Sequence, residues 1–334
     1  MELAQDQFSM GAKDTSWDRA LDAVRTTLHV PAALSTLIRG AWGNNITPKD
    51  FFRLLGYPGS NSACLVRAAE STQEGEPLTS IDVEGAIEKL GVRTAAVTVA
   101  VNFVCQSMLE SAPPEKVWLP VLKRLMSDVE IGYHFGMSAE RLGTEEGILV
   151  GFSYWAGLAV LLGRHPREFA ELFKSGDLNV SKQLVTEAFG CEAYQAGSLA
   201  LQQLGFGPDV ATAAAIAVGD LRTDLVQVKA EVATWRAARL WISALGRGEL
   251  YPTDESAQQA FPELIPPVLY ELGRNELPLH LSMLYQHINQ VREVHSAWTW
   301  HLPRATYEET GREVAKNGMS HAYTTSRTQT AVVR

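Results

Sequence analysis

The feature that most constrains the fold is a long uncharged stretch near the middle of the chain. Residues 148–163 contain no charged side chain. Glu145 and Glu146 precede the stretch, and Arg164 and His165 follow it. Acidic residues at the start and basic residues at the end suit the macrodipole of a helix. Its 16 uncharged residues fall short of the ~20 that a membrane-spanning helix needs. The stretch therefore predicts a central helix buried in a globular core, and no membrane insertion is expected.

Helical periodicity and helix caps recur along the chain, which predicts an all-α, multi-helical bundle. Thr15 and Asp18 have the spacing of a capping box, and Thr47 with Asp50 marks a second helix start. Gly91 stands where a left-handed residue is expected to end a helix. No convincing run alternates apolar and polar residues as a half-buried strand would.

Composition favours a protein of the cytoplasm. The net charge of −9 argues against a broad phosphate-binding surface, so nucleic acid is not the expected partner. Cys64, Cys105 and Cys191 are widely separated in apolar, helix-like sequence, which predicts buried free thiols in a reducing compartment. Residues 1–14 are polar and lack the plan of a signal peptide, and we expect them to form a flexible leader.

The rest of the chain divides into three predicted parts. Residues 15–250 form the main helical domain, and the run 246–253 is the expected boundary. Residues 251–303 form a C-terminal helical extension, and residues 304–334 a short helix with a flexible tail. Within the extension, apolar and aromatic positions repeat at alternating spacings of four and three: Leu277, Leu281, Leu284, Ile288, Val291, His295 and Trp298. This heptad seam either packs on its own domain or mediates homodimer or partner contacts.

Three segments resemble landmarks of one bacterial family. Residues 65–71 read LVRAAES, residues 81–91 read IDVEGAIEKLG, and residues 150–157 read VGFSYWAG. In order and spacing they stand where HDOD domains carry Leu-x-Arg-x-Ala-Asn-Ser, Ile-x-Ser-x-x-x-Ala-Ile-x-x-Leu-Gly and Ala-Gly-Leu-Leu-His-Asp-Ile-Gly. About two thirds of the chain, from Val30 to about Gly248, thus resembles an HDOD domain, a signalling domain related to the HD phosphohydrolases. The resemblance implies a helical scaffold that receives a signal or a partner.

The resemblance also places the metal site of an HD hydrolase, where imidazoles and carboxylates hold metal ions that activate water. The His–Asp pair falls on Tyr154 and Trp155, the upstream His on Pro120, and a later His near Ala193. The terminal metal-binding Asp falls within residues 236–239, which contain no carboxylate. The resemblance therefore implies a degenerate site without metal or other cofactor. The chain is interpreted as a pseudoenzyme that acts in signal transduction by binding a protein partner or a small ligand.

Other residues leave further interpretations open. Arg236 and Arg239 either line a pocket for an anionic ligand or form a solvated helix face. His280 and His287 lie two helical turns apart, ~10 Å, too far to hold one metal by themselves. A phosphohydrolase with rearranged metal ligands is one alternative function. A nucleic-acid-associated regulator, suggested only by Arg327 and Arg334 in the tail, is another.

Overall fold

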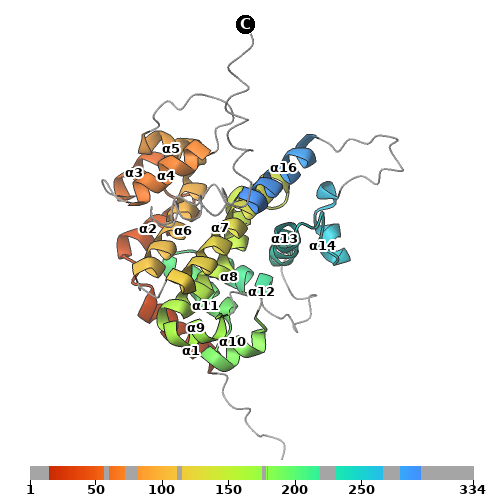
Figure 1. The fold of residues 1–334 in the computed structure, drawn as a ribbon. Coiled ribbons are helices and arrows are strands. Elements are labelled where there is room, and N and C mark those ends of the chain that lie inside the picture. The colour runs from red at the N-terminus through yellow and green to blue at the C-terminus, as the bar shows by residue number, and fades with distance from the viewer. Residues whose placement is uncertain are drawn as a thin grey trace, which may run out of the picture.

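The structure, a computed structural model, describes residues 15–55, 60–71, 82–110, 115–174, 178, 180–218, 230–265 and 279–294. Within these ranges the regular structure is helical and no strand occurs, which confirms the predicted all-α class. Figure 1 shows the helices gathered around α7 and α8. The residues of the leader, of the C-terminal short helix and of the tail lie outside the described ranges.

The first half of the chain contains α1 (Ser16–Thr27), α2 (Ala32–Trp42), α3 (Pro48–Leu55), α4 (Ser60–Ser71), α5 (Val83–Leu90), α6 (Val92–Glu110), α7 (Glu115–Ser138) and α8 (Thr144–Arg164). The second half contains α9 (Pro166–Leu172), α10 (Lys182–Phe189), α11 (Ala193–Leu204), α12 (Pro208–Val218), α13 (Ala230–Arg247), α14 (Glu255–Ala260), the 3-10 helix η2 (Pro262–Leu264) and α16 (Leu279–Val294).

The predicted helix caps have different outcomes. At α3, Asp50 N–H donates to Thr47 Oγ1 (3.2 Å), and Thr47 N–H donates to Asp50 Oδ2 (3.3 Å), so this reciprocal cap is confirmed. The capping box at α1 is wrong, because Thr15 makes no side-chain cap hydrogen bond. Its ψ of 1° departs from the extended backbone from which a cap side chain reaches the first turn. Gly91 has the positive φ (78°) that favours glycine, but its ψ of 151° is extended and not left-handed helical.

The uncharged stretch forms α8, and it is a core helix as predicted. Every residue from Gly147 to Leu162 except Tyr154 is buried. The helix packs against α7 on one side and α11 on another, with α6 also in contact. By length and composition α8 could cross a membrane, but 83% of its most apolar window is buried inside the protein. That burial is typical of the central helix of a globular fold.

Glycines allow the backbones around α8 to approach one another. A Cβ at Gly151 would clash with the carbonyl oxygen of Asp128 on α7, and one at Gly147 would clash with that of Gly132. On the opposite side, a Cβ at Gly157 would clash with the carbonyl oxygen of Ala193 on α11. Because these neighbours are backbone atoms, no side-chain rotation can make room. The glycines therefore set how closely α7 and α11 approach α8.

Residues after 250 pack onto the same core as those before it. Trp241 Nε1 on α13 donates to the carbonyl of Ala257 (2.9 Å) on α14. The ring of Phe135 on α7 meets Phe261 edge to face at 5.1 Å. Tyr285 on α16 donates its hydroxyl to the carbonyl of Leu250 (2.9 Å). The hydrophobic core is thus continuous across the predicted boundary at residues 246–253.

Four members of the heptad seam lie on α16, which packs on α7 and α13. These four members, Leu281, Leu284, Ile288 and Val291, are each 3% exposed or less. The chain's own core already covers them, so contacts with a second chain through these residues would require α16 to leave its position. Leu277, His295 and Trp298 lie outside the described residues.

The three cysteines are buried and free, as predicted. Burial raises the pKa of the Cys64 and Cys105 thiols well above the ordinary range. Burial also raises the pKa of Cys191 to about 11. Because the thiolate is the reactive form, burial and raised pKa values disfavour nucleophilic reactions at these cysteines, which pack as small core side chains.

Candidate functional site

Tyr154 and Trp155, which the sequence resemblance assigns to the HD pair, lie on α8 in contact with residues of α7 and α13. Trp155 is 5% exposed and donates its Nε1 hydrogen to Asp128 Oδ2 on α7 at 2.6 Å. The ring of Tyr154 meets that of Trp155 edge to face at 5.2 Å. The guanidinium of Arg239, on α13, lies 5.7 Å from the centre of the Tyr154 ring. This position is therefore filled with packed aromatic side chains, each with a polar or cationic neighbour.

Asp128 is the centre of the polar contacts at this position. Its side chain is 1% exposed, and its Oδ2 accepts a second hydrogen bond, from Arg239 Nη1 at 3.2 Å. Arg124, one turn earlier on α7, brings Nε to 3.2 Å from Oδ1. That contact is an ion pair without hydrogen-bond geometry, since Oδ1 has no hydrogen-bond partner among the described residues. The carboxylate is thus compensated by two guanidinium groups and an indole.

The two arginines of the predicted anion pocket point toward different acidic groups. Arg239 is 14% exposed at its side chain and is engaged by Asp128. Arg236, three residues earlier on α13, is near enough to Asp254 to help lower the pKa of that carboxyl, although Ser256 and Ala257 lower it more. Arg239 thus contacts Asp128 and Tyr154, whereas Arg236 lies near Asp254.

The other two positions that the resemblance assigns to metal ligands, Pro120 and Ala193, lie on α7 and at the start of α11. Pro120 lies inside α7, eight residues and about two turns before Asp128. Ala193 begins α11, where its carbonyl lies against Gly157 of α8. Burial raises the pKa of Tyr154; Arg239 opposes that shift, and the nearby Glu192 adds to it. Among the residues that the structure describes, no group of three or more His, Cys, Asp or Glu could hold a metal ion.

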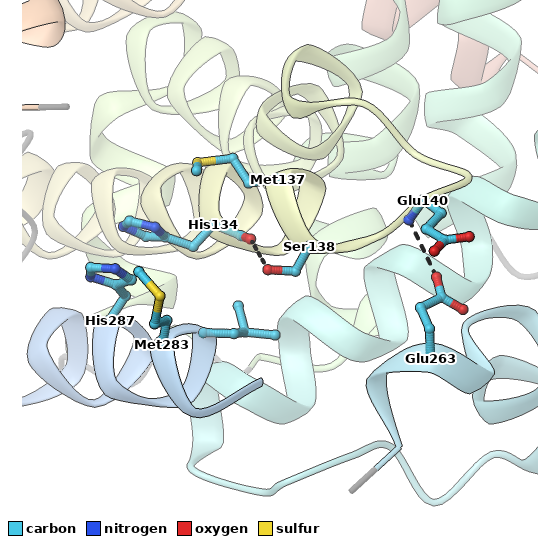
Figure 2. A pocket seen from close by; sticks show the side chains of 8 residues that line it. His134, Met137, Ser138, Glu140, Glu263, Met283 and His287 are labelled. Carbon is cyan, nitrogen blue, oxygen red and sulfur yellow. Dashed lines mark hydrogen bonds between the residues drawn. The ribbon is translucent and has the colours of Figure 1, made fainter. Parts of the chain in front are cut away.

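A separate cavity opens between α7, α16 and η2, with a volume of about 580 Å³. Figure 2 shows His134 and His287 at one end, Glu140 and Glu263 at the other, and Ser138 and Met283 between them. The other lining residues are Met137 and Leu284. Leu284 is buried, whereas Met137 is 60% exposed and Met283 38% exposed, so the methionines form part of the rim.

The two histidines form a parallel stack across the helix interface. Their ring centres are 4.4 Å apart and the planes differ by 6°. Burial, with a contribution from His287, lowers the pKa of His134 to about 4. His134 Nε2 also lies 4.0 Å from Glu130 Oε1, which is too long for a hydrogen bond. At neutral pH the His134 ring is therefore an uncharged, stacked surface and not a cation.

The opposite end of the cavity carries the negative charge. The backbone N–H of Glu140 donates to Glu263 Oε1 at 3.3 Å, which ties η2 to the end of α7. Neither carboxylate forms an ion pair with a Lys or Arg in the described parts of the chain. Among the described residues, no arginine or lysine lines the cavity. The site thus has an apolar, aromatic half and an acidic half.

Sequence reasoning missed both Asp128 and the histidine pair. The spacing of four residues between Arg124 and Asp128 on a helix was a signal that the Asp128 carboxylate would be paired. His134 carried no comparable signal, because its stacking partner His287 lies 153 residues further along the chain. The sequence suggests only His280 as a neighbour of His287 on the same helix, and the side chain of His280 is outside the described set.

No protein-family model matches the chain. No curated protein matches it either. Among solved structures, the chain is similar to an HDOD domain protein of unknown function from Geobacter sulfurreducens. The identity is 11% and the TM-score 0.59, over 86% of this chain and 99% of that one.

It is also similar to a protein from Shewanella amazonensis named "Putative phosphohydrolase", with 15% identity and a TM-score of 0.54 over 85% of this chain and 98% of that one. The chain therefore has the fold of an HDOD domain protein. The structural match also extends over more of the chain than the two thirds in which the sequence resemblance lies.

Proposed function

We propose that this HDOD-like chain is a regulatory protein of the cytoplasm that works by binding a partner or ligand, not by hydrolysing a phosphate ester. The observation that carries the proposal is that the buried Asp128 carboxylate is already engaged by neighbouring side chains. Trp155, one of the two residues assigned to the HD pair, and Arg239 both donate to its Oδ2. This arrangement is typical of a structural polar cluster.

The chemistry of these groups supports the proposal. A divalent metal ion needs several lone pairs that converge on one point. The resemblance assigns metal ligands to the positions of Trp155, Pro120 and Ala193. The side chains of tryptophan, proline and alanine offer no ordinary metal ligand. A cation approaching Asp128 would also meet the positive charges of Arg124 and Arg239 and would have to displace their contacts. The residues present favour a packed core at this position over a metal centre.

The competing function is a metal-dependent phosphohydrolase with rearranged ligands, for which the name of the Shewanella protein is the support. Hydrolysis of bis(p-nitrophenyl) phosphate in the presence of Mn²⁺, Fe²⁺ or Zn²⁺ separates the two. We expect no metal-dependent turnover above the rate of the metal ion alone.

Asp128→Asn and Asp22→Asn are the matched variants for this assay, because Asp22 forms an exposed ion pair with Arg164 away from the cluster. Turnover that depends on the metal, disappears in Asp128→Asn and survives in Asp22→Asn would establish the hydrolase instead. Circular dichroism of both variants shows whether the Asp128→Asn chain remains folded.

A further inference from the structure

We propose that the cavity between α7 and α16 binds a small organic cation with an apolar ring, such as an aromatic amine. This inference rests on the proposed binding function and adds a ligand class to it. The cavity is open, with a volume of about 580 Å³, whereas the cluster around Asp128 is filled by buried side chains such as Trp155. That volume lies within the roughly 300–1,000 Å³ typical of small-ligand sites.

The apolar half of the cavity fits the ring of such a ligand. Leu284, 2% exposed, contributes to the wall, and Met283 lies beside it with 38% exposure. Thioethers adapt to irregular shapes and make favourable contacts with aromatic rings. The stacked rings of His134 and His287 close this end, as Figure 2 shows. Because burial keeps His134 uncharged at neutral pH, this end does not repel a cation.

The acidic half fits the charged group. Glu263 uses one oxygen to accept the Glu140 N–H, which leaves its second oxygen and the Glu140 carboxylate for a ligand. Neither is paired with a cation in the described parts of the chain, so an ammonium group would gain charge-assisted hydrogen bonds without breaking an ion pair. An anionic ligand would meet these two carboxylates, and no arginine or lysine is among the described lining residues.

Isothermal titration calorimetry with phenethylamine, and with phenylacetate as the anion of matched ring, tests the proposal. We expect phenethylamine to bind with a Kd on the order of 1 mM, as befits so small a ligand, and to bind more weakly as salt rises. We expect phenylacetate to bind at least ~10-fold more weakly because its charge is reversed. Equal binding of the two, or binding of neither, would overturn the assignment.

Variants locate the binding. Glu140→Gln combined with Glu263→Gln keeps an acceptor for the backbone N–H of residue 140 but removes both charges. This double variant should raise the Kd of phenethylamine at least ~5-fold. Met283→Ala should raise the Kd of phenethylamine ~3-fold, because it removes apolar contact with the ring of the ligand. Glu84→Gln with Glu88→Gln, on α5, should have no effect. An unchanged Kd in the first variant, or tighter binding of a basic decapeptide than of the amine, would sink the small-cation site.

These results are distinguishable from those that bear on hydrolysis. Failure of phenethylamine to bind a chain that also lacks metal-dependent turnover overturns only the ligand class. Metal-dependent turnover overturns the proposed function, whatever the amine does.

Discussion

Asp128 is the buried carboxylate that contacts Trp155, one of the two residues that the sequence resemblance assigns to the HD pair. A buried carboxylate is stable only when its charge is compensated, and here Arg124, Arg239 and Trp155 provide the compensation. The same contacts hold α7, α8 and α13 together, since one partner comes from each of the three helices. The cluster therefore has a structural role that requires no ligand.

Removing this carboxylate should destabilise the fold. Asp128→Ala leaves Trp155 Nε1 and the largely buried Arg239 without their acceptor, and we expect a loss of about 3 kcal/mol in the free energy of unfolding. The control is Asp22→Ala, whose carboxylate is 64% exposed and pairs with Arg164. Its loss should stay below about 1 kcal/mol. Urea unfolding measures both, and equal losses would contradict a structural role for the buried cluster.

The stacked histidines predict a pH dependence of stability. Burial lowers the pKa of His134 from 6.5 to about 4, so the unfolded chain takes up a proton at higher pH than the folded one. Stability should therefore be fully present above pH 6.5 and fall as the pH drops toward 4, by on the order of 1–3 kcal/mol. His134→Phe should remove this component. Urea unfolding at several pH values measures the free energy of unfolding of both chains. If that free energy falls equally in wild type and variant between pH 6.5 and pH 4, the ring is not held neutral.

At the scale of elements, α7 and α8 approach each other through glycines spaced four residues apart. Gly132 and Gly136 on α7 lie against Gly147 and Gly143 at the start of α8, and Gly151 lies against the Asp128 carbonyl. This four-residue spacing was readable from the sequence. What the sequence could not show was which helix each glycine faces, because that depends on contacts between distant segments.

Gly151→Ala tests this close approach. In an exposed helix, Ala is favoured over Gly by about 1 kcal/mol, but here the added Cβ meets the backbone oxygen of Asp128. We expect a net destabilisation of about 2 kcal/mol or more. Gly207→Ala, where nothing lies within 4 Å of the added Cβ, should change stability little. Thermal unfolding compares the two, and a stabilised Gly151→Ala chain would show that the helices do not touch there.

Helix identity was predicted well because it rests on local signals. Thr47 and Asp50 begin α3 as expected, and the uncharged stretch forms α8. The capping box at Thr15 failed although its residue types were right, because the backbone there does not extend. Pairings such as Asp128 with Arg239, 111 residues apart, carry no local signal and could not be predicted.

At the scale of the molecule, the described residues share one core. The sequence suggested a break after residue 250 because the run 246–253 contains glycine, proline and polar residues. The chain turns there, but Trp241, Phe261 and Tyr285 join the two sides. The polar turn therefore lies between segments that share one hydrophobic core. The seam on α16 had a clear heptad period, yet the period alone could not say whether its partner was this chain or another.

Charged substitutions on α16 distinguish those two cases. Leu284→Lys with Ile288→Lys would place two charges at sites that are each 2% exposed, and we expect a loss of several kcal/mol, comparable to the stability of a whole domain. Gln286→Lys with Asn289→Lys, at exposed positions of the same helix, should be tolerated. Circular dichroism with light scattering reads the outcome. A folded monomer from the first variant would instead indicate that these residues mediate association.

The metal content of the purified chain tests the central claim most directly. The protein is prepared without chelator and analysed by inductively coupled plasma mass spectrometry, with metal expressed relative to protein. Because Trp155, Arg239 and Arg124 occupy the surroundings of Asp128, we predict only traces of iron, manganese and zinc, far below stoichiometric amounts. Stoichiometric metal that is lost in Asp128→Asn would contradict the account and identify the cluster as a metal centre.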